Sequence, residues 1–237
     1  MFEKKKVILF DMDGTLIDSV GIWNEVDSTL ILQLGGKKLP EEEIQIQRDT
    51  LLRKFSKCPN PYEEYCGTLG KKYGSPLAPA EIVKLRYNIA QRFLVEAVDY
   101  KPDAEKLLKL LKEAGYTLVI ATTTKRGNMD IYRTKNKNIL EKAPLDDYFS
   151  LIYTREDVKE IKPNPEIYHR IMGELGVTPE ECLIFEDSLI GVEAGNNAGI
   201  QVAAVYDRYS AGETKEIKER ADYYFDNFAQ VIALLSK

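Results

Sequence analysis

Two aspartates separated by one residue, Asp11 and Asp13, directly follow a short apolar run near the start of the chain. The run covers residues 7–10, and Gly14 follows the aspartates, which predicts a buried strand that ends in a turn. Carboxylates two residues apart begin on the same face of an extended chain, and they repel unless a cation or a proton neutralises one of them. The carboxyl end of a strand is also where open α/β sheets bind ligands. For this stretch alone, an ordinary Asp-Gly turn after a strand is the alternative.

Two further apolar runs also end in polar residues. The run that ends at Ala121 leads into hydroxyl groups and a lysine, and the run that ends at Phe185 leads into two acids. If the three runs are neighbouring parallel strands, these polar residues meet at one edge of the sheet together with Lys162. The residues that would gather there are Asp11, Asp13, Thr122, Thr123, Lys162, Glu186 and Asp187.

This set of side chains suits one kind of chemistry. Oxygen ligands without His or Cys favour Mg²⁺, which keeps waters and commonly bridges to a phosphate. A lysine and hydroxyls beside the carboxylates would neutralise and hold the free oxygens of a phosphoryl group. The sequence therefore predicts a magnesium and phosphate site.

Composition narrows the class of protein. The chain has 237 residues, 44% of them hydrophobic and 30% charged, with a net charge of −5. These values predict a globular protein and argue against nucleic acid as a partner. No apolar stretch approaches the roughly 20 residues of a membrane span, and the first apolar run is too short for a signal peptide. We therefore expect a cytoplasmic protein without a membrane partner, either a monomer or a weak homodimer, whose three cysteines are reduced.

The patterning of apolar residues predicts two domains. Residues 18–97 show helical spacing over about 19–34, 40–55, 61–73 and 79–98, with no convincing strand. From residue 100 onward, helices and strands alternate, which is typical of a parallel sheet built from β-α-β units. We expect an α/β protein with a Rossmann-like parallel sheet core flanked by helices (1–17 plus 98–237) and an inserted all-α helical cap (18–97).

Some local expectations are more specific. Residues of about 127–140 are expected to form one polar helix, and Pro163 is expected in the first turn of a helix that runs to Leu175. Trp23 is expected to serve packing. Arg48 and Arg53 are candidates for selecting an anionic substrate, although solvated helix positions are the more ordinary interpretation.

Four segments, taken in order, resemble the motifs of the haloacid dehalogenase-like hydrolases, in the branch with a helical cap after the first motif. The matching segments are Asp11-Met12-Asp13-Gly14-Thr15, Thr122 at its strand end, Lys162 in Ile161-Lys162-Pro163-Asn164-Pro165, and Phe185-Glu186-Asp187-Ser188 with Gly191 and Ala198-Gly199. The resemblance covers residues 1–20 and about 98–205. The insert between them shows no cap signature, so the resemblance does not identify a substrate.

The resemblance implies a role for each residue. Asp11 would be the nucleophile that forms an aspartyl-phosphate, and Asp13 the general acid and base. Asp11 and Asp187 would bind Mg²⁺ through side chains and Asp13 through its backbone carbonyl, with Glu186 a direct or indirect partner of the metal. Thr122 and Lys162 would hold the phosphoryl group. Thr123 would add a backbone contact, and Lys125 would reach a second substrate anion, although solvation is the commoner role for such a lysine.

Three functions compete at this stage. The first is Mg²⁺-dependent hydrolysis of a small phosphate monoester, such as a sugar phosphate or a similar metabolite, with the helical insert closing over the substrate. The second is a sugar-phosphate mutase of the β-phosphoglucomutase type, and the third is a catalytically silent binding module. The intact acids and lysine argue against the silent module. Sugar mutases of this family carry a His in the first cap helix where this chain has Gly21-Ile22-Trp23-Asn24, so hydrolysis is favoured.

Overall fold

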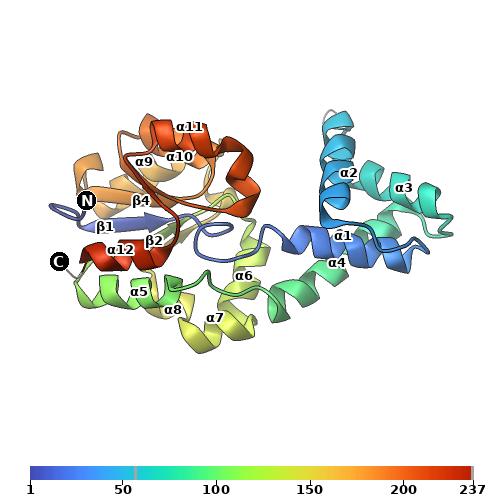
Figure 1. Ribbon diagram of the computed structural model, residues 1–237, viewed down its shortest axis with the longest axis horizontal. Helices are drawn as coiled ribbons and strands as arrows, with labels where there is room; N and C mark the ends of the chain where they lie inside the picture. Colours follow the sequence, from blue (N-terminus) through green and yellow to red (C-terminus); the bar gives the residue numbers. More distant parts are fainter. Residues whose placement is uncertain (56–57, 236–237) are drawn as a thin grey trace. The chain divides into compact units, whose positions relative to one another are not determined.

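The computed structural model describes residues 1–55 and 58–235 (Figure 1). The chain divides into two compact units, the α/β unit formed by Met1–Val20 with Val98–Lys237, and the helical unit formed by Gly21–Ala97. The sequence placed the first boundary slightly earlier, between residues 17 and 18. That the two parts are independent domains stays a prediction.

The α/β unit is built around a six-stranded sheet in which every neighbouring pair of strands is parallel. The strand order is β3-β2-β1-β4-β5-β6, so β1 lies between β2 and β4. The strands are β1 (Val7–Phe10), β2 (Thr117–Ala121), β3 (Leu151–Tyr153), β4 (Cys182–Glu186), β5 (Gln201–Val205) and β6 (Tyr223–Phe225). This arrangement confirms the predicted Rossmann-like parallel sheet.

Helices fill the connections between these strands. The α-helices are α5 (Ala104–Glu113), α6 (Arg126–Thr134), α7 (Lys137–Lys142), α8 (Leu145–Tyr148), α9 (Glu166–Leu175), α10 (Leu189–Asn197), α11 (Thr214–Arg220) and α12 (Phe228–Leu235). Short 3₁₀ helices are η1 (Arg155–Asp157), η2 (Pro179–Glu181) and η3 (Arg208–Glu213). Figure 1 shows α9, α10 and α11 on one side of the sheet, and α5, α8 and α12 on the other.

The central strand is buried on both faces, which is why it reads as a continuous apolar run. Val7 and Leu9 belong to the same buried cluster as Ile167 of α9 and Val192 of α10. Phe10 stacks on Phe185, with 5.0 Å between ring centroids. Alternate residues of β1 thus pack into different parts of the core.

The register of the sheet decides which residues emerge together at its carboxyl edge. Phe10 is level with Ile120 of β2 and with Phe185 of β4. The Asp11 amide donates to the Phe185 carbonyl at 3.0 Å, so Asp11 leaves the sheet beside the end of β4. This pairing brings together the polar residues at the ends of β1, β2 and β4.

The prediction of one helix over about 127–140 is wrong. The segment forms α6 and α7, separated around Asn136. The Asn136 side chain accepts a hydrogen bond from the Ile139 amide at 2.8 Å and donates to the Val98 carbonyl at 3.0 Å. An asparagine that satisfies backbone groups in this way caps a new helix instead of continuing the old one.

The expected position of Pro163 is also wrong. The Lys162–Pro163 peptide bond is cis, and α9 begins only at Glu166, with Pro165 as its N-cap residue. The Asn164 side chain accepts from the Glu166 amide at 2.9 Å, which satisfies one of the free donors at the start of α9. Lys162 therefore lies in a loop before the helix.

The helical unit contains α1 (Ile22–Gln33), α2 (Glu41–Lys54), α3 (Pro61–Tyr73) and α4 (Pro79–Glu96), and no strand among its described residues. Asn60 caps the start of α3 through the Glu63 amide, and Gly74 ends it in a left-handed conformation. The apolar sides of the helices share one core, with Leu30, Leu69 and Ile82 among its fully buried members. The all-helical insert matches the prediction from spacing.

A buried ion pair lies inside the helical unit. Asp27 is fully buried and accepts from Arg86 Nε at 2.6 Å, Arg86 Nη2 at 3.1 Å and Arg48 Nη1 at 3.2 Å. The Arg86 guanidinium lies 5.0 Å from the centre of the Trp23 ring. Arg48 is thus not a solvated helix residue, whereas Trp23 packs as expected. The side chain of Arg53 lies outside the described residues.

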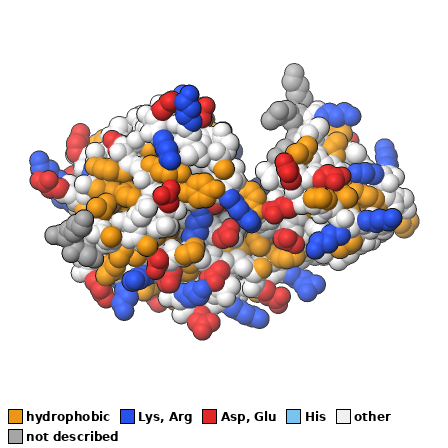
Figure 2. All heavy atoms as spheres, in the orientation of Figure 1, with side chains coloured by type: hydrophobic (Ala, Val, Ile, Leu, Met, Phe, Trp, Pro, Cys, Tyr) orange, Lys and Arg blue, Asp and Glu red, His pale blue; other side chains and the backbone are white. Residues whose placement is uncertain are grey.

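None of the helices described here is both long enough and apolar enough to cross a membrane. Figure 2 shows side chains of both charges spread over the face in view.

Candidate active site

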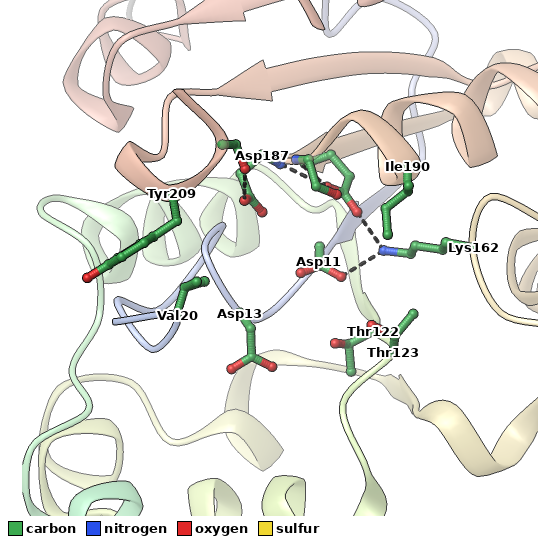
Figure 3. Close-up of a pocket in the computed structure, with 12 residues that line it drawn as sticks. Asp11, Asp13, Val20, Thr122, Thr123, Lys162, Asp187, Ile190 and Tyr209 are labelled. Carbon is green, nitrogen blue, oxygen red and sulfur yellow. Dashed lines mark hydrogen bonds and ion pairs between the residues drawn. The ribbon is translucent and has the colours of Figure 1, made fainter. Parts of the chain in front are cut away.

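A cavity of about 220 Å³ opens at the carboxyl ends of β1, β2 and β4 (Figure 3). It contains every side chain of the predicted site except one, together with residues from the loop after β5. The lining residues are Asp11, Asp13, Val20, Thr122, Thr123, Lys162, Glu186, Asp187, Ser188, Ile190, Tyr209 and Ser210. Lys125 is the exception, because it is exposed at the N-cap of α6 and does not line the cavity.

Lys162 is the cation at the centre of the site. Its Nζ lies 2.7 Å from Asp11 Oδ1 and 2.7 Å from Glu186 Oε1, and the residue is 4% exposed. Burial alone would lower the pKa of this ammonium group, but the two carboxylates outweigh burial and raise its pKa well above the usual value. Lys162 therefore stays charged and bridges the ends of β1 and β4, as Figure 3 shows.

Glu186 holds Lys162 in place and is itself held by backbone groups. Its Oε2 accepts from the Asp187 amide at 2.9 Å, the Ser188 amide at 3.0 Å and the Ser188 hydroxyl at 3.0 Å. The side chain lies across Gly191, where a Cβ would be only 1.8 Å from Glu186 Oε1. Glycine at position 191 is thus required by the position of Glu186.

Asp187 is a buried carboxylate without a lysine or arginine partner in the described part of the chain. Thr15 donates to its Oδ1 at 2.7 Å and Ser210 to its Oδ2 at 3.2 Å. Gly14, with φ of +84°, turns the chain around it, and a Cβ there would lie 2.6 Å from Asp187 Oδ2. Burial, followed by the negative charges of Glu186 and Asp11, raises the pKa of Asp187 well above its usual value.

The pKa of Asp11 is raised for similar reasons. Burial is the largest cause, and Glu186 adds to it, while Lys162 opposes it, so that the pKa of Asp11 rises to about 7. The cavity wall holds four carboxylates and only one lysine. When all four carboxylates are ionised, their mutual repulsion favours the binding of a further cation.

The donor set fits Mg²⁺. All candidate ligands are oxygen atoms, and Mg²⁺ is typically bound by one or two carboxylates, with water and substrate phosphate completing its shell. Asp11 and Asp187 would hold the ion. Among the described residues, no group of three or more His, Cys, Asp and Glu side chains is arranged to hold a metal ion. Both oxygens of Glu186 are engaged, one by Lys162 and one by backbone amides, whereas Lys162 contacts only Oδ1 of Asp11. A site with two side-chain ligands is consistent with that finding.

Asp13 is surrounded by hydroxyl groups that the sequence did not assign to the site. Its Oδ1 accepts from the Ser19 hydroxyl and, at 3.3 Å, from the Tyr132 hydroxyl. Its Oδ2 accepts from the Thr124 hydroxyl. Ser19 and Thr124 flank the recognised motifs, which is a usable signal, whereas Tyr132 lies far from Asp13 in sequence and offers none.

The lining residues outside the predicted set are Val20, Ser188, Ile190, Tyr209 and Ser210. Tyr209 and Ser210 come from η3, which follows β5, and Tyr209 joins Val20 and Ile190 as the apolar part of the wall. Of the predicted substrate contacts, Thr122 is buried in the cavity wall, and Thr123 is exposed at the cavity surface.

Comparison with known proteins agrees with this arrangement. Residues 8–205 match the family model described as haloacid dehalogenase-like hydrolase. Protein CbbY of Rhodobacter capsulatus is 30% identical, with 88% of each chain covered, and hexitol phosphatase A of Escherichia coli is 32% identical, with 84% of this chain and 82% of the relative covered. The crystal structure of a Thermotoga maritima protein, proposed to be a beta-phosphoglucomutase, has a TM-score of 0.75 and 24% identity and covers 98% of both chains.

A parallel sheet flanked by helices, with carboxylates at its central strand ends and a helical insert after the first strand, is typical of hydrolases with a Rossmann-like core and a helical cap. The chain belongs to the haloacid dehalogenase-like hydrolase family. This confirms the resemblance, and with relatives named as phosphatases it also confirms the prediction of an enzyme, a phosphatase of this family.

Replacing Gly191 with Ala is expected to disrupt the site through its contact with Glu186. The new Cβ would displace Glu186 and release Lys162, so we expect activity to fall at least about 10-fold, with a loss of roughly 1–3 kcal/mol in the free energy of unfolding. The matched control is Gly173→Ala in α9, where a Cβ meets no heavy atom within 4 Å. This control should keep activity and gain about 0.5–1 kcal/mol. Urea unfolding and turnover of both variants are the measurements, and a fully active Gly191→Ala protein would contradict the packing.

The metal-free protein is expected to lose stability as the pH rises. In the unfolded chain both aspartates ionise near pH 4, whereas in the folded chain Asp11 holds its proton to about 7 and Asp187 also holds its proton longer. The folded state binds more protons in this window, so these two groups remove roughly 1–4 kcal/mol of stability between about pH 4 and 7. Unfolding in EDTA at several pH values should show a smaller decline for Asp187→Asn. Equal slopes for both proteins would contradict the pKa directions.

Proposed function

We propose that this protein is a Mg²⁺-dependent phosphatase that hydrolyses small phosphate monoesters through a phosphorylated Asp11. The observation that carries the proposal is the contact between Asp11 and Lys162, 2.7 Å apart, at the end of the central strand and inside the cavity. A buried carboxylate beside a fixed cation can attack phosphorus while the lysine neutralises the charge on the phosphoryl oxygens.

The first half of the reaction transfers the phosphoryl group to the enzyme. An Asp11 oxygen forms a bond to phosphorus, the bond from phosphorus to the leaving oxygen breaks, and its electron pair stays on that oxygen. The protonated carboxyl of Asp13 donates its proton to the leaving oxygen, which departs as an alcohol. The Thr122 hydroxyl and Lys162 bind the phosphoryl oxygens that take no part in the bonds formed and broken.

The second half returns the enzyme to its starting state. A water oxygen attacks phosphorus, Asp13 takes a proton from that water, and the bond from phosphorus to Asp11 breaks. Inorganic phosphate leaves, Asp11 is a carboxylate again and Asp13 is again protonated. Bound Mg²⁺ would supply the positive charge that lets an anionic substrate enter a cavity lined by acids. We assign Asp11, Asp187 and the Asp13 backbone carbonyl as its ligands, and Glu186 as the partner of Lys162 instead of a ligand.

A sugar phosphate or a similar small metabolite is the proposed substrate class. Hexitol phosphatase A and a Thermotoga maritima phosphatase of phosphorylated carbohydrates are among the relatives, at 32% and 27% identity, which supports this class. Water is the proposed acceptor. A mutase would instead need a second sugar hydroxyl to receive the phosphoryl group. The cavity wall also includes apolar surface, which Val20, Ile190 and Tyr209 contribute. A cytoplasmic location and a monomeric or weakly dimeric state stay predictions from the sequence.

The test is a panel of phosphate monoesters incubated with the protein in Mg²⁺ or in EDTA. We expect free phosphate to be released with Mg²⁺, and activity to be lost in EDTA and in Asp11→Asn, because these remove the metal and the nucleophile. The Asp11→Asn protein should remain folded, since the residue belongs to a cavity and not to the apolar core. Full activity in EDTA would contradict the metal assignment. Conversion of glucose 1-phosphate to glucose 6-phosphate much faster than phosphate release, with a trace of glucose bisphosphate, would favour the mutase.

A further inference from the structure

Three hydroxyl groups from three separate parts of the chain converge on the carboxylate of Asp13. Ser19 comes from the end of the first segment of the α/β unit, Thr124 from the loop after β2, and Tyr132 from α6. Ser19 and Tyr132 are each 1% exposed, so two of the three partners are held rigidly inside the unit. Both oxygens of Asp13 are engaged by this hydroxyl cluster.

Tyr132 has the least freedom of the three. It lies in the buried side of α6, beside Met129 and Ile131, and its ring cannot turn without disturbing that packing. Its hydroxyl lies 3.3 Å from Asp13 Oδ1. A tyrosine on the buried side of a helix ordinarily serves packing, and its hydroxyl needs a hydrogen-bond partner. Here the acceptor is the carboxylate that the proposed reaction uses as its acid and base.

The chemical type of these partners matters for such a carboxylate. A hydroxyl can donate a hydrogen bond to an ionised carboxylate and can accept one from a protonated carboxyl, whereas a lysine or arginine can only donate. A cluster of hydroxyls can therefore hold the Asp13 carboxyl in one position through hydrogen bonds of either direction. This property suits a carboxyl that has to stay in one position while it donates and accepts a proton.

The direction of Asp13 is also suited to its step. Figure 3 shows its carboxylate pointing away from Asp11. In an in-line displacement the nucleophile and the leaving oxygen lie on opposite sides of phosphorus, so the acid has to act on the side away from Asp11.

We infer that Tyr132 is a positioning residue for proton transfer, which holds Asp13 where it delivers its proton to the leaving oxygen. The inference rests on the proposed phosphatase function and goes beyond it by assigning a role to a helix residue outside the recognised motifs. Tyr132 itself neither touches the substrate nor changes its protonation. Its hydroxyl limits the positions of Asp13, so its loss slows the steps in which Asp13 transfers a proton.

The test uses two aryl phosphates of similar size that differ in how much their leaving groups need a proton. Phenyl phosphate releases a phenol with a pKa near 10, as for tyrosine, and 4-nitrophenyl phosphate releases a much weaker base that departs without help. We expect Tyr132→Phe to lower kcat/KM for phenyl phosphate about 10-fold and for 4-nitrophenyl phosphate less than about 3-fold. The quantity kcat/KM is chosen because it includes departure of the leaving group and excludes the later hydrolysis of the phosphoenzyme.

The matched control is Tyr100→Phe, which removes the hydroxyl of another buried tyrosine. Tyr100 is 6% exposed and donates to the Ala143 carbonyl at 2.5 Å. This control should lower stability without changing the ratio of kcat/KM for the two esters. If Tyr132→Phe does not fold, Tyr132→Met, which also lacks the hydroxyl, gives the same comparison.

The outcomes separate this inference from the proposed function. Suppose that the wild-type protein hydrolyses both esters and that Tyr132→Phe loses equal activity toward both, or none. This result leaves the proposed phosphatase function intact and contradicts the positioning role. The same preferential loss in Tyr100→Phe also contradicts it, because a general effect of packing would then explain the result. A wild-type protein that hydrolyses neither ester with Mg²⁺ present contradicts the phosphatase and this inference together.

Discussion

The bridge that Lys162 makes between Asp11 and Glu186 is the interaction on which the site depends. One ammonium group, almost fully buried, lies 2.7 Å from a carboxylate at the end of β1 and 2.7 Å from another at the end of β4. Burying charges is costly unless each is paired, and removing one partner of such a cluster leaves the others uncompensated. Lys162 therefore organises the two central strand ends, and the remaining excess of acid makes the cavity receptive to a divalent cation.

The rest of the fold can be understood as support for that bridge. The register of β1 with β2 and β4 brings Asp11 beside the ends of both neighbours, and stacking of Phe10 on Phe185 secures that register from within the core. Backbone amides hold one oxygen of Glu186. Glycines at positions 14 and 191 leave the space that Asp187 and Glu186 occupy. Lys162 pairs with Asp11 and Glu186, and hydroxyl groups hold the other two acids, Asp13 and Asp187.

Much of this could be predicted from the sequence, because local signals and one topological rule were sufficient. Apolar runs followed by Asp11, Thr122 and Glu186 predicted strand ends, and parallel pairing predicted that those ends meet. The features that were missed depend on how distant segments pack. Nothing near Tyr132 in sequence indicates that α6 turns its hydroxyl toward Asp13, and Ser210 reaches Asp187 from a loop after β5. Asn136 divides a predicted helix because its side chain finds the Val98 carbonyl, a contact that periodicity does not encode. Lys125 follows the motif closely, yet it is exposed at the N-cap of α6 and does not line the cavity.

The central claim is that Asp11 becomes covalently phosphorylated during turnover. The most direct measurement is mass spectrometry of peptides from protein quenched in acid while it hydrolyses a phosphate monoester with Mg²⁺. The account predicts one added phosphoryl group on the peptide that contains Asp11, and its disappearance once the substrate is exhausted. Turnover without any phosphorylated peptide, or with the phosphoryl group on a residue other than Asp11, would contradict the account.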